Sequence, residues 1–195
     1  MPHIYLASSS PRRREILELI KLPHTVLAID VDESLPPGMT APEQVESLSR
    51  RKANYAARKL PGGVVIAADT VVVLDGEVLG KPEDETMAME MLERLQGRTH
   101  EVFTGVTVWD IVRGSSVTGH DRTFVDMRPV TRDELFRYIA TGEPMDKAGA
   151  YGIQGLGSVL ITGIRGCYFN VMGLPVYKLT LMLKELDIDV SEYWG

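Results

Sequence analysis

The chain has 195 residues and a net charge of −6, and 44% of its residues are hydrophobic and 25% are charged. This composition predicts one sizeable globular core, and the negative net charge argues against a general nucleic-acid binder. The sequence contains no apolar run of the roughly 18 residues that a membrane span needs. Cys167 is the only cysteine and the four histidines are scattered, which excludes an intramolecular disulfide and a cysteine metal cluster, and the N-terminus lacks the order of a secretory signal, so a cytoplasmic location is expected.

A strand over His3–Ala7 is predicted to lead into a hydroxyl-rich turn, Ser8-Ser9-Ser10-Pro11, and then into a helix. Ser10 is a favourable N-cap and Pro11 a favourable first helical residue. Arg12, Arg13 and Arg14 follow, although a helix N-terminus disfavours cations and favours anions. The turn therefore resembles a phosphate cradle, and the alternative is a solvated basic patch.

A second strand is predicted over His24–Val31, followed by the acids Asp32 and Glu33. The capping box that begins at Thr40 and contains Glu43 then opens a second helix, which stops at the Pro61-Gly62-Gly63 break. Arg50, Arg51 and Lys52 lie on this helix, and spacing alone does not distinguish Lys52 from a solvated face. Glu33 can equally be a surface acid beside a loop.

The apolar stretch from Val64 to Pro82 predicts a buried strand, an Asp75-Gly76 hairpin turn and a second strand. One carboxylate, Asp69, lies inside this apolar run and is followed by Thr70. A buried charge is costly unless a cation or a hydrogen-bond donor meets it. Lys81, at the end of the second strand, could supply such a cation, and the alternative is a structural ion pair or a capped turn.

Later segments predict three more helices, two long strands and a last hairpin. Asp84 caps a helix that ends at Gly97, Thr131 opens one that ends near Gly142, and Pro175 opens one through Leu186. The strands are expected over 101–110 and 115–127, and the hairpin over 159–164 and 167–171.

The segment from Glu143 to Gly157 is too rich in glycine and alanine for an interior helix or strand. It is predicted to be a loop that wraps closely around something, with Asp146, Lys147 and Gln154 placed along it. The alternative is a flexible connector, but Tyr151 and Ile153 provide anchors that a linker would lack.

Helices and strands are interleaved, while the middle strands are consecutive, which predicts an α/β protein with a mixed sheet and two lobes that enclose a cleft. The cations, acids and backbone N–H groups suit a polyphosphate and a divalent ion. No histidine stands in a plausible relation to Ser8, Ser9 or Ser10, which argues against a serine hydrolase, and no Walker A pattern occurs.

The sequence resembles the Maf family of nucleoside triphosphate pyrophosphatases over essentially its whole length. The motifs that carry the resemblance are LASSSPRRREIL at 6–17, AADTVVVLDGEVLGKP at 67–82, TGEPMDKAGAYGIQGLG at 141–157 and NVMGLPV at 170–176. The form KAGAYGIQG at 147–155 is similar to the branch that prefers dTTP and UTP.

The resemblance implies hydrolysis of a nucleoside triphosphate to the monophosphate and pyrophosphate, as house-cleaning of the nucleotide pool. It also implies one domain over residues 1–195, with two lobes and an elongated central sheet flanked by helices, as in the inosine triphosphate pyrophosphatases. The active site is expected in the cleft between the lobes, with Mg²⁺ or Mn²⁺ as cofactor. A homodimer is expected as well.

Carried over by motif, the resemblance makes Asp69 the proton acceptor and adds Lys52 and Lys81 as catalytic cations. It also implies that the metal is bound by Glu33 and Asp69. The substrate-binding residues that it implies are Ser8, Arg12, Arg13, Thr70 and Gln154. The amide of Gln154 has a donor and an acceptor that match the O4 and N3–H edge of thymine or uracil. Mg²⁺ takes one or two carboxylates and otherwise keeps waters and phosphate oxygens.

Two alternatives remain open from the sequence. The first is a nucleotide-responsive regulator of cell division that acts through a protein partner. The second is a pyrophosphatase for other, modified nucleotides.

Overall fold

The computed structural model describes residues 1–194. Within them, seven strands form one sheet in the order β2-β1-β3-β5-β6-β7, with β4 paired to β3. Parallel and antiparallel pairs both occur, so the predicted mixed α/β class is confirmed. No helix in this range is both long enough and apolar enough to cross a membrane.

The chain divides into two compact units. Unit 1 contains 1–69, 104–121 and 173 onward, and unit 2 contains 70–103 and 122–172. The long strands β3 (Val64–Leu74), β5 (Thr99–Asp110) and β6 (Ser115–Met127) each contribute residues to both units.

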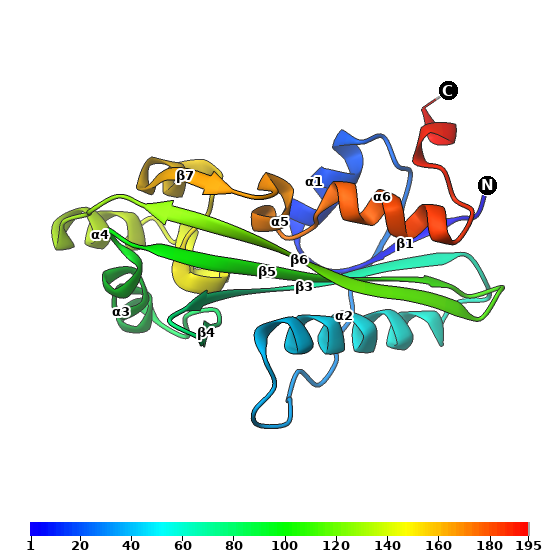
Figure 1. Cartoon of the computed structure of the whole chain (residues 1–195), viewed down its shortest axis with the longest axis horizontal. Helices are drawn as coiled ribbons and strands as arrows, with labels where there is room; N and C mark the ends of the chain where they lie inside the picture. The colour runs from blue at the N-terminus through cyan, green and yellow to red at the C-terminus, as the bar shows by residue number, and fades with distance from the viewer. Residues whose placement is uncertain (195) are drawn as a thin grey trace. The chain divides into compact units, whose positions relative to one another are not determined.

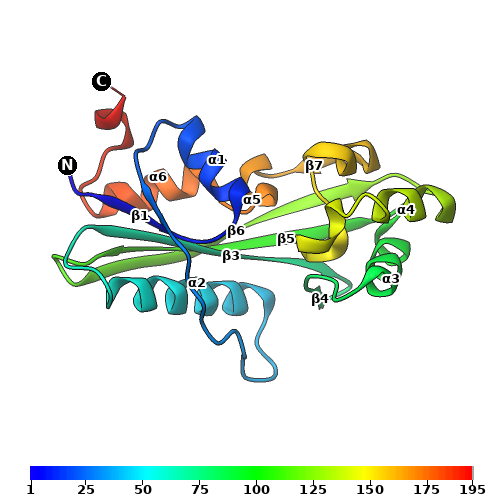
Figure 2. The same cartoon turned by 180° about the vertical axis from the view of Figure 1, so that it is seen from behind.

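In unit 1, β1 (Ile4–Ala7) pairs in parallel with β2 (Thr25–Leu27) and with β3. The helix α2 (Ala41–Ala57) lies along one face of these strands, and α1 (Pro11–Leu19) and α6 (Val176–Glu185) lie on the other face (Figures 1 and 2). A short 3-10 turn, η4 (Val190–Tyr193), follows α6.

Small side chains let α2 lie close to the sheet. The cluster between them is built mainly of alanines, with Ala53 and Ala56 on the helix and Ala67 on β3. On β5, a Cβ added to Gly105 would lie 2.3 Å from the carbonyl oxygen of Val45. This close approach brings the side chains of α2 within reach of the centre of β3.

The predicted caps are confirmed in position and differ in detail. Glu43 accepts a hydrogen bond from the Thr40 amide at 2.8 Å, as a capping box requires. Ser10 is the N-cap residue of α1, but its side chain makes no capping hydrogen bond. The Ser8 hydroxyl instead accepts from the Ser10 amide at 3.1 Å.

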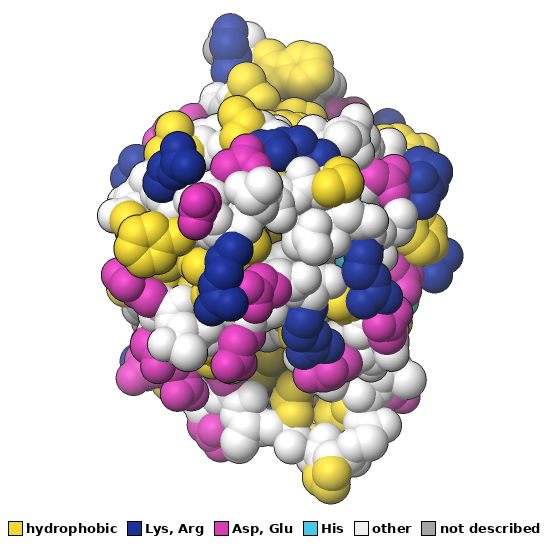
Figure 3. Space-filling view, turned by 90° about the vertical axis from the view of Figure 1, so that its left-hand side faces the viewer, with side chains coloured by type: hydrophobic (Ala, Val, Ile, Leu, Met, Phe, Trp, Pro, Cys, Tyr) yellow, Lys and Arg dark blue, Asp and Glu magenta, His cyan; other side chains and the backbone are white. Residues whose placement is uncertain are grey.

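In unit 2, Asp75 and Gly76 have φ of 52° and 81°, so the predicted hairpin between β3 and β4 (Glu77–Leu79) is confirmed. The Asp84 carboxylate accepts from the Met87 amide at 2.7 Å and caps α3 (Glu85–Leu95), which contacts α4 (Arg132–Ile139). On the side of the molecule where these helices lie, basic and acidic side chains are intermixed and no single sign gathers (Figure 3).

The glycine-rich segment of unit 2 folds into three short 3-10 turns, η1 (Glu143–Asp146), η2 (Ala148–Ala150) and η3 (Gly155–Leu160). The strand β7 (Ile161–Arg165) follows and pairs with β6 in antiparallel fashion.

Two strand predictions were wrong in extent or type. The predicted strand over 167–171 is instead the helix α5 (Tyr168–Met172). Asn170 is fully buried there and donates to the Val102 carbonyl and to the Thr123 hydroxyl at 2.9 and 3.0 Å, contacts that an alternating strand would not deliver. The strand predicted over 24–31 shortens to Thr25–Leu27, because β2 pairs only with the few residues of β1.

Candidate active site

The basic first turn of α1 is tied to two other parts of unit 1. The Arg13 guanidinium donates from Nε to the Gly173 carbonyl at 2.8 Å and from Nη1 to the Ser8 hydroxyl at 3.2 Å. Gly173 adopts a φ of 108°, which favours glycine at this position. Arg13 and Ser8 therefore point inward, whereas Arg14 lies on the surface with Glu18.

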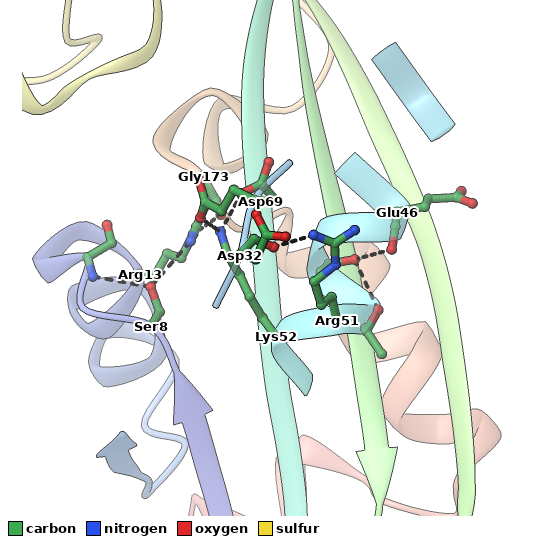
Figure 4. A network of polar contacts seen from close by, with 12 residues as sticks. Ser8, Arg13, Asp32, Glu46, Arg51, Lys52, Asp69 and Gly173 are labelled. Carbon is green, nitrogen blue, oxygen red and sulfur yellow. Dashed lines mark hydrogen bonds and ion pairs between the residues drawn. The ribbon is translucent and has the colours of Figure 1, made fainter. Parts of the chain in front are cut away.

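Lys52 joins two carboxylates at one point. It comes from α2, and its Nζ lies 2.6 Å from Asp69 Oδ1 and 2.7 Å from Glu33 Oε1. The side chains of Lys52 and Asp69 are only 13% and 12% exposed, while that of Glu33 is 60% exposed. Figure 4 shows Arg13 and Lys52 extending toward Asp69 and Gly173 from different elements.

The loop that carries Glu33 is fixed by its neighbours on both sides. Arg51, next to Lys52 on α2, donates to the carbonyl of Asp32 and, at 3.0 Å, to that of Ser34 (Figure 4). The Asp32 carboxylate accepts from the amide and the hydroxyl of Ser34. This arrangement presents the Glu33 side chain to Lys52.

The electrostatics of the turn reflect all of these charges. The pKa of the Arg13 guanidinium is lowered, chiefly by burial and also by the neighbouring charge of Arg12. The carboxylates of Asp69 and Glu33 act in the opposite direction and raise it. These residues are therefore close enough to act on one another. Lys52 contacts both carboxylates and Arg13 lies close enough to feel the charge of both, so at least two cations and two carboxylates meet here.

The remaining predicted residues lie in unit 2. Thr70 follows Asp69 on β3 and is half-buried, and Lys81 is exposed just after β4. Gln154 is half-buried and immediately precedes η3. The structure thus brings Ser8, Arg13, Lys52, Glu33 and Asp69 together in unit 1, with Arg12 beside Arg13. The roles assigned to all of these residues stay predictions.

Of the two predicted anchors of the glycine-rich loop, Tyr151 is confirmed, whereas Ile153 is only half-buried. Tyr151 is 5% exposed, and its hydroxyl lies 2.7 Å from His100 Nε2. The loop is therefore no flexible connector.

The donor set fits a divalent cation of the magnesium class. Within residues 1–194, no group of three or more His, Cys, Asp or Glu side chains gathers in a way that could hold a metal by itself. Glu33 and Asp69 nevertheless face the same ammonium, and Mg²⁺ normally needs only one or two carboxylates besides substrate oxygens and waters. These two residues would hold it.

Sequence reasoning missed Arg51 and Gly173 as supports of the site. Gly173 lies in the NVMGLPV motif, so a signal existed, but the motif gave no partner for its carbonyl. Arg51 carries no distinguishing signal, because its role depends on where the Glu33 loop passes.

A family model described as Maf-like protein matches residues 3–186. Several curated proteins named dTTP/UTP pyrophosphatase are similar to this chain. The protein from Desulforamulus reducens is 47% identical over 190 residues, which cover 97% of this chain and 100% of that protein. The protein from Pelotomaculum thermopropionicum is 48% identical with the same coverage, and one from Bacillus cereus is 43% identical over 191 residues, which cover 98% and 99%.

Among solved structures, the Staphylococcus aureus Ham1 protein aligns with a TM-score of 0.49 and 18% identity over 82% of this chain and 79% of that one. A nucleoside-triphosphatase, described as a dITP/XTP pyrophosphatase, from Mycobacterium abscessus aligns with a TM-score of 0.44 and 15% identity over 95% and 97%.

Proposed function

The chain belongs to the Maf-like protein family, and from this premise we propose that it hydrolyses nucleoside triphosphates to the monophosphate and pyrophosphate, with dTTP and UTP as substrates. The observation that carries the proposal is the meeting of Asp69 and Glu33 on Lys52, beside the inward-pointing Arg13. A triphosphate and a cation need this combination of opposite charges.

The reaction follows from the chemistry of these groups. Water attacks the α-phosphorus, the bond from that phosphorus to the bridging oxygen of the β-phosphate breaks, and pyrophosphate leaves. Asp69 takes the proton from the attacking water. Lys52 holds Asp69 in place, and Lys52, Arg13 and the Ser8 hydroxyl stabilise the charge that grows on the phosphate oxygens.

A divalent cation, when bound by Glu33 and Asp69, supplies Lewis-acid stabilisation of the phosphate oxygens. The ammonium of Lys52 keeps the two carboxylates directed to one point. Arg51 holds the loop that carries Glu33 in place through hydrogen bonds to the carbonyls of Asp32 and Ser34.

The choice of base rests on the family resemblance and on the names of the relatives. Gln154 reads the O4 and N3–H edge of thymine or uracil, and Arg12, Thr70 and Lys81 contribute to substrate binding and catalysis. The two units work as one domain, and the protein acts as a cytoplasmic homodimer that removes unwanted nucleotides from the pool.

The test is pyrophosphate release from UTP by the unchanged protein and by Asp69→Asn. Asparagine cannot accept the proton, so kcat should fall by roughly a hundredfold or more. The fold should survive, because Lys52 keeps its ion pair with Glu33. Asp30→Asn, at an exposed position on the same unit, is the matched control and should keep full activity. Unchanged turnover in Asp69→Asn would remove this residue from the mechanism.

A further inference from the structure

The loop that carries Gln154 folds around one carboxylate of its own unit. Glu143 Oε2 accepts a hydrogen bond from the Leu156 amide, and Oε1 accepts one from the Gly157 amide, each at 2.8 Å. The residues just after Gln154 are thereby fixed to η1.

Tyr138 on α4 fixes the other side of the same loop. Its hydroxyl accepts a hydrogen bond from the Gly152 amide at 3.1 Å and donates one to Glu143 Oε1 at 3.0 Å. Gln154 thus lies between two fixed stretches of backbone, Gly152 and 156–157. The two side chains that fix them, Tyr138 and Glu143, are hydrogen-bonded to each other and are called the clamp below.

The glycines of the loop are those that this arrangement requires. A Cβ at Gly155 would lie 2.6 Å from Glu143 Oε2. A Cβ at Gly157 would lie 2.4 Å from the Gly152 carbonyl oxygen and 2.6 Å from the Tyr138 hydroxyl. The backbone therefore closes directly onto Tyr138 and Glu143.

The protonation states suit these hydrogen bonds. Burial raises the pKa of Tyr138, and the neighbouring Glu143 adds to this, so the phenol keeps its proton and donates it to the carboxylate. Burial alone would raise the pKa of Glu143, but the hydrogen bonds from Gly157, Leu156 and Tyr138 outweigh burial and the pKa is lowered. Glu143 therefore stays an ionised acceptor at neutral pH.

We propose that Tyr138 and Glu143 are positioning residues for base selection, which hold Gln154 in the orientation that distinguishes uracil and thymine from other bases. The inference rests on the proposed function. Neither side chain needs to touch the nucleotide, since both act through the backbone on either side of Gln154.

A site that reads a base through one amide is sensitive to the rotation of that amide. Uracil and cytosine differ at the N3 and C4 edge, where donor and acceptor are exchanged, so a rotated amide of Gln154 would accept cytosine as readily as uracil. Loss of the clamp should consequently lower the preference for UTP over CTP more than it lowers turnover.

The experiment measures kcat and KM for UTP and CTP in the unchanged protein, Tyr138→Phe, Glu143→Gln and Gln154→Ala. The phenylalanine removes only the hydroxyl, and glutamine keeps one of the two acceptor oxygens. We expect the UTP-to-CTP ratio of kcat/KM to fall roughly tenfold in each clamp variant, chiefly through KM for UTP, because small misplacements of a contacting group have effects of this size or larger.

Double variants separate positioning from a general structural effect. If the clamp acts through Gln154, then Tyr138→Phe in a Gln154→Ala background should lower the ratio no further. Tyr177→Phe, 74% exposed on α6, and Glu90→Gln, exposed on α3, are the matched controls and should leave the ratio unchanged.

The outcomes distinguish this inference from the function on which it rests. Absence of pyrophosphate release from UTP and dTTP in the unchanged protein would refute the proposed function. An unchanged ratio in both clamp variants of a selective enzyme, or an equal loss of kcat/KM for UTP and CTP, would overturn the positioning role alone. Should Glu143→Gln fail to fold, Tyr138→Phe decides by the same ratio.

Discussion

The buried histidine behind the glycine-rich loop should make the protein sensitive to mild acid. His100 is 2% exposed, its Nε2 lies 2.7 Å from the Tyr151 hydroxyl, and its Nδ1 has no hydrogen-bond partner within the described residues. Burial lowers the pKa of His100 from 6.5 to about 4, although Asp126 acts in the opposite direction. A protonated ring would need a second acceptor that this site does not offer.

The sign and size of the effect follow from proton linkage. Between pH 6.5 and about 4, the unfolded chain binds a proton at His100 that the folded protein does not bind, so the free energy of unfolding falls as the pH falls. Each pH unit of the shift corresponds to about 1.4 kcal/mol, so His100 alone should lower the free energy of unfolding by roughly 3 kcal/mol between pH 7 and pH 4.

Urea unfolding at a series of pH values measures this loss directly. His100→Gln keeps a polar group that can contact Tyr151 but cannot titrate, so its stability should decline less between pH 7 and pH 4 than that of the unchanged protein, by roughly the 3 kcal/mol just derived. His24→Gln, whose ring nitrogen contacts the Leu22 carbonyl at 2.9 Å, is the matched control and should retain the full decline. Parallel declines in all three proteins would refute the reasoning.

Two further predictions concern the close packing of α2 and the metal. Gly105→Ala places a Cβ 2.3 Å from the Val45 carbonyl oxygen and should lower the free energy of unfolding by about 2–3 kcal/mol. Gly80→Ala, which has open space around its Cβ, is the control and should change the free energy of unfolding by less than about 0.5 kcal/mol. Equal stability of the two variants in urea unfolding would contradict the packing argument. Removal of divalent cations with EDTA should abolish pyrophosphate release, and added Mg²⁺ should restore it. The far-UV circular dichroism should not change, because no group of three or more ligands within residues 1–194 ties the fold to a metal; activity that survives EDTA would exclude the Glu33–Asp69 cation.

Local signals gave most of the fold. The capping box at Thr40 and the Asp75-Gly76 turn each act within a few residues, and the structure has both where they were predicted. The failure over 167–171 has the opposite cause. An apolar run with aromatic residues favours a strand by composition, but the buried contacts of Asn170 with Val102 and Thr123 involve residues far away in the sequence.

In the candidate site, too, some residues had a local sequence signal and others depend on contacts with distant residues. Asp69 was singled out because a charge inside an apolar strand is unusual, and that signal is local. Lys52 and Glu33 had no local signal, since each is an ordinary charged residue until α2 packs on Val65 and Ala67 of β3 and brings Lys52 to both acids. Only the family resemblance named them before the structure joined them.

A purely structural ion pair is the main alternative for Lys52 and Asp69, and the surroundings argue against it. A structural pair in a nearly buried place needs one cation for one carboxylate, and further charges add to the cost of desolvation. Here Glu33 also binds Lys52, while Arg13 and Arg12 come from a helix whose first turn contains no acid. That turn disfavours cations through the helix dipole. Two arginines in a helix first turn and a second carboxylate on the same ammonium are more than a simple structural pair requires, which agrees with the proposed anionic ligand and its cation.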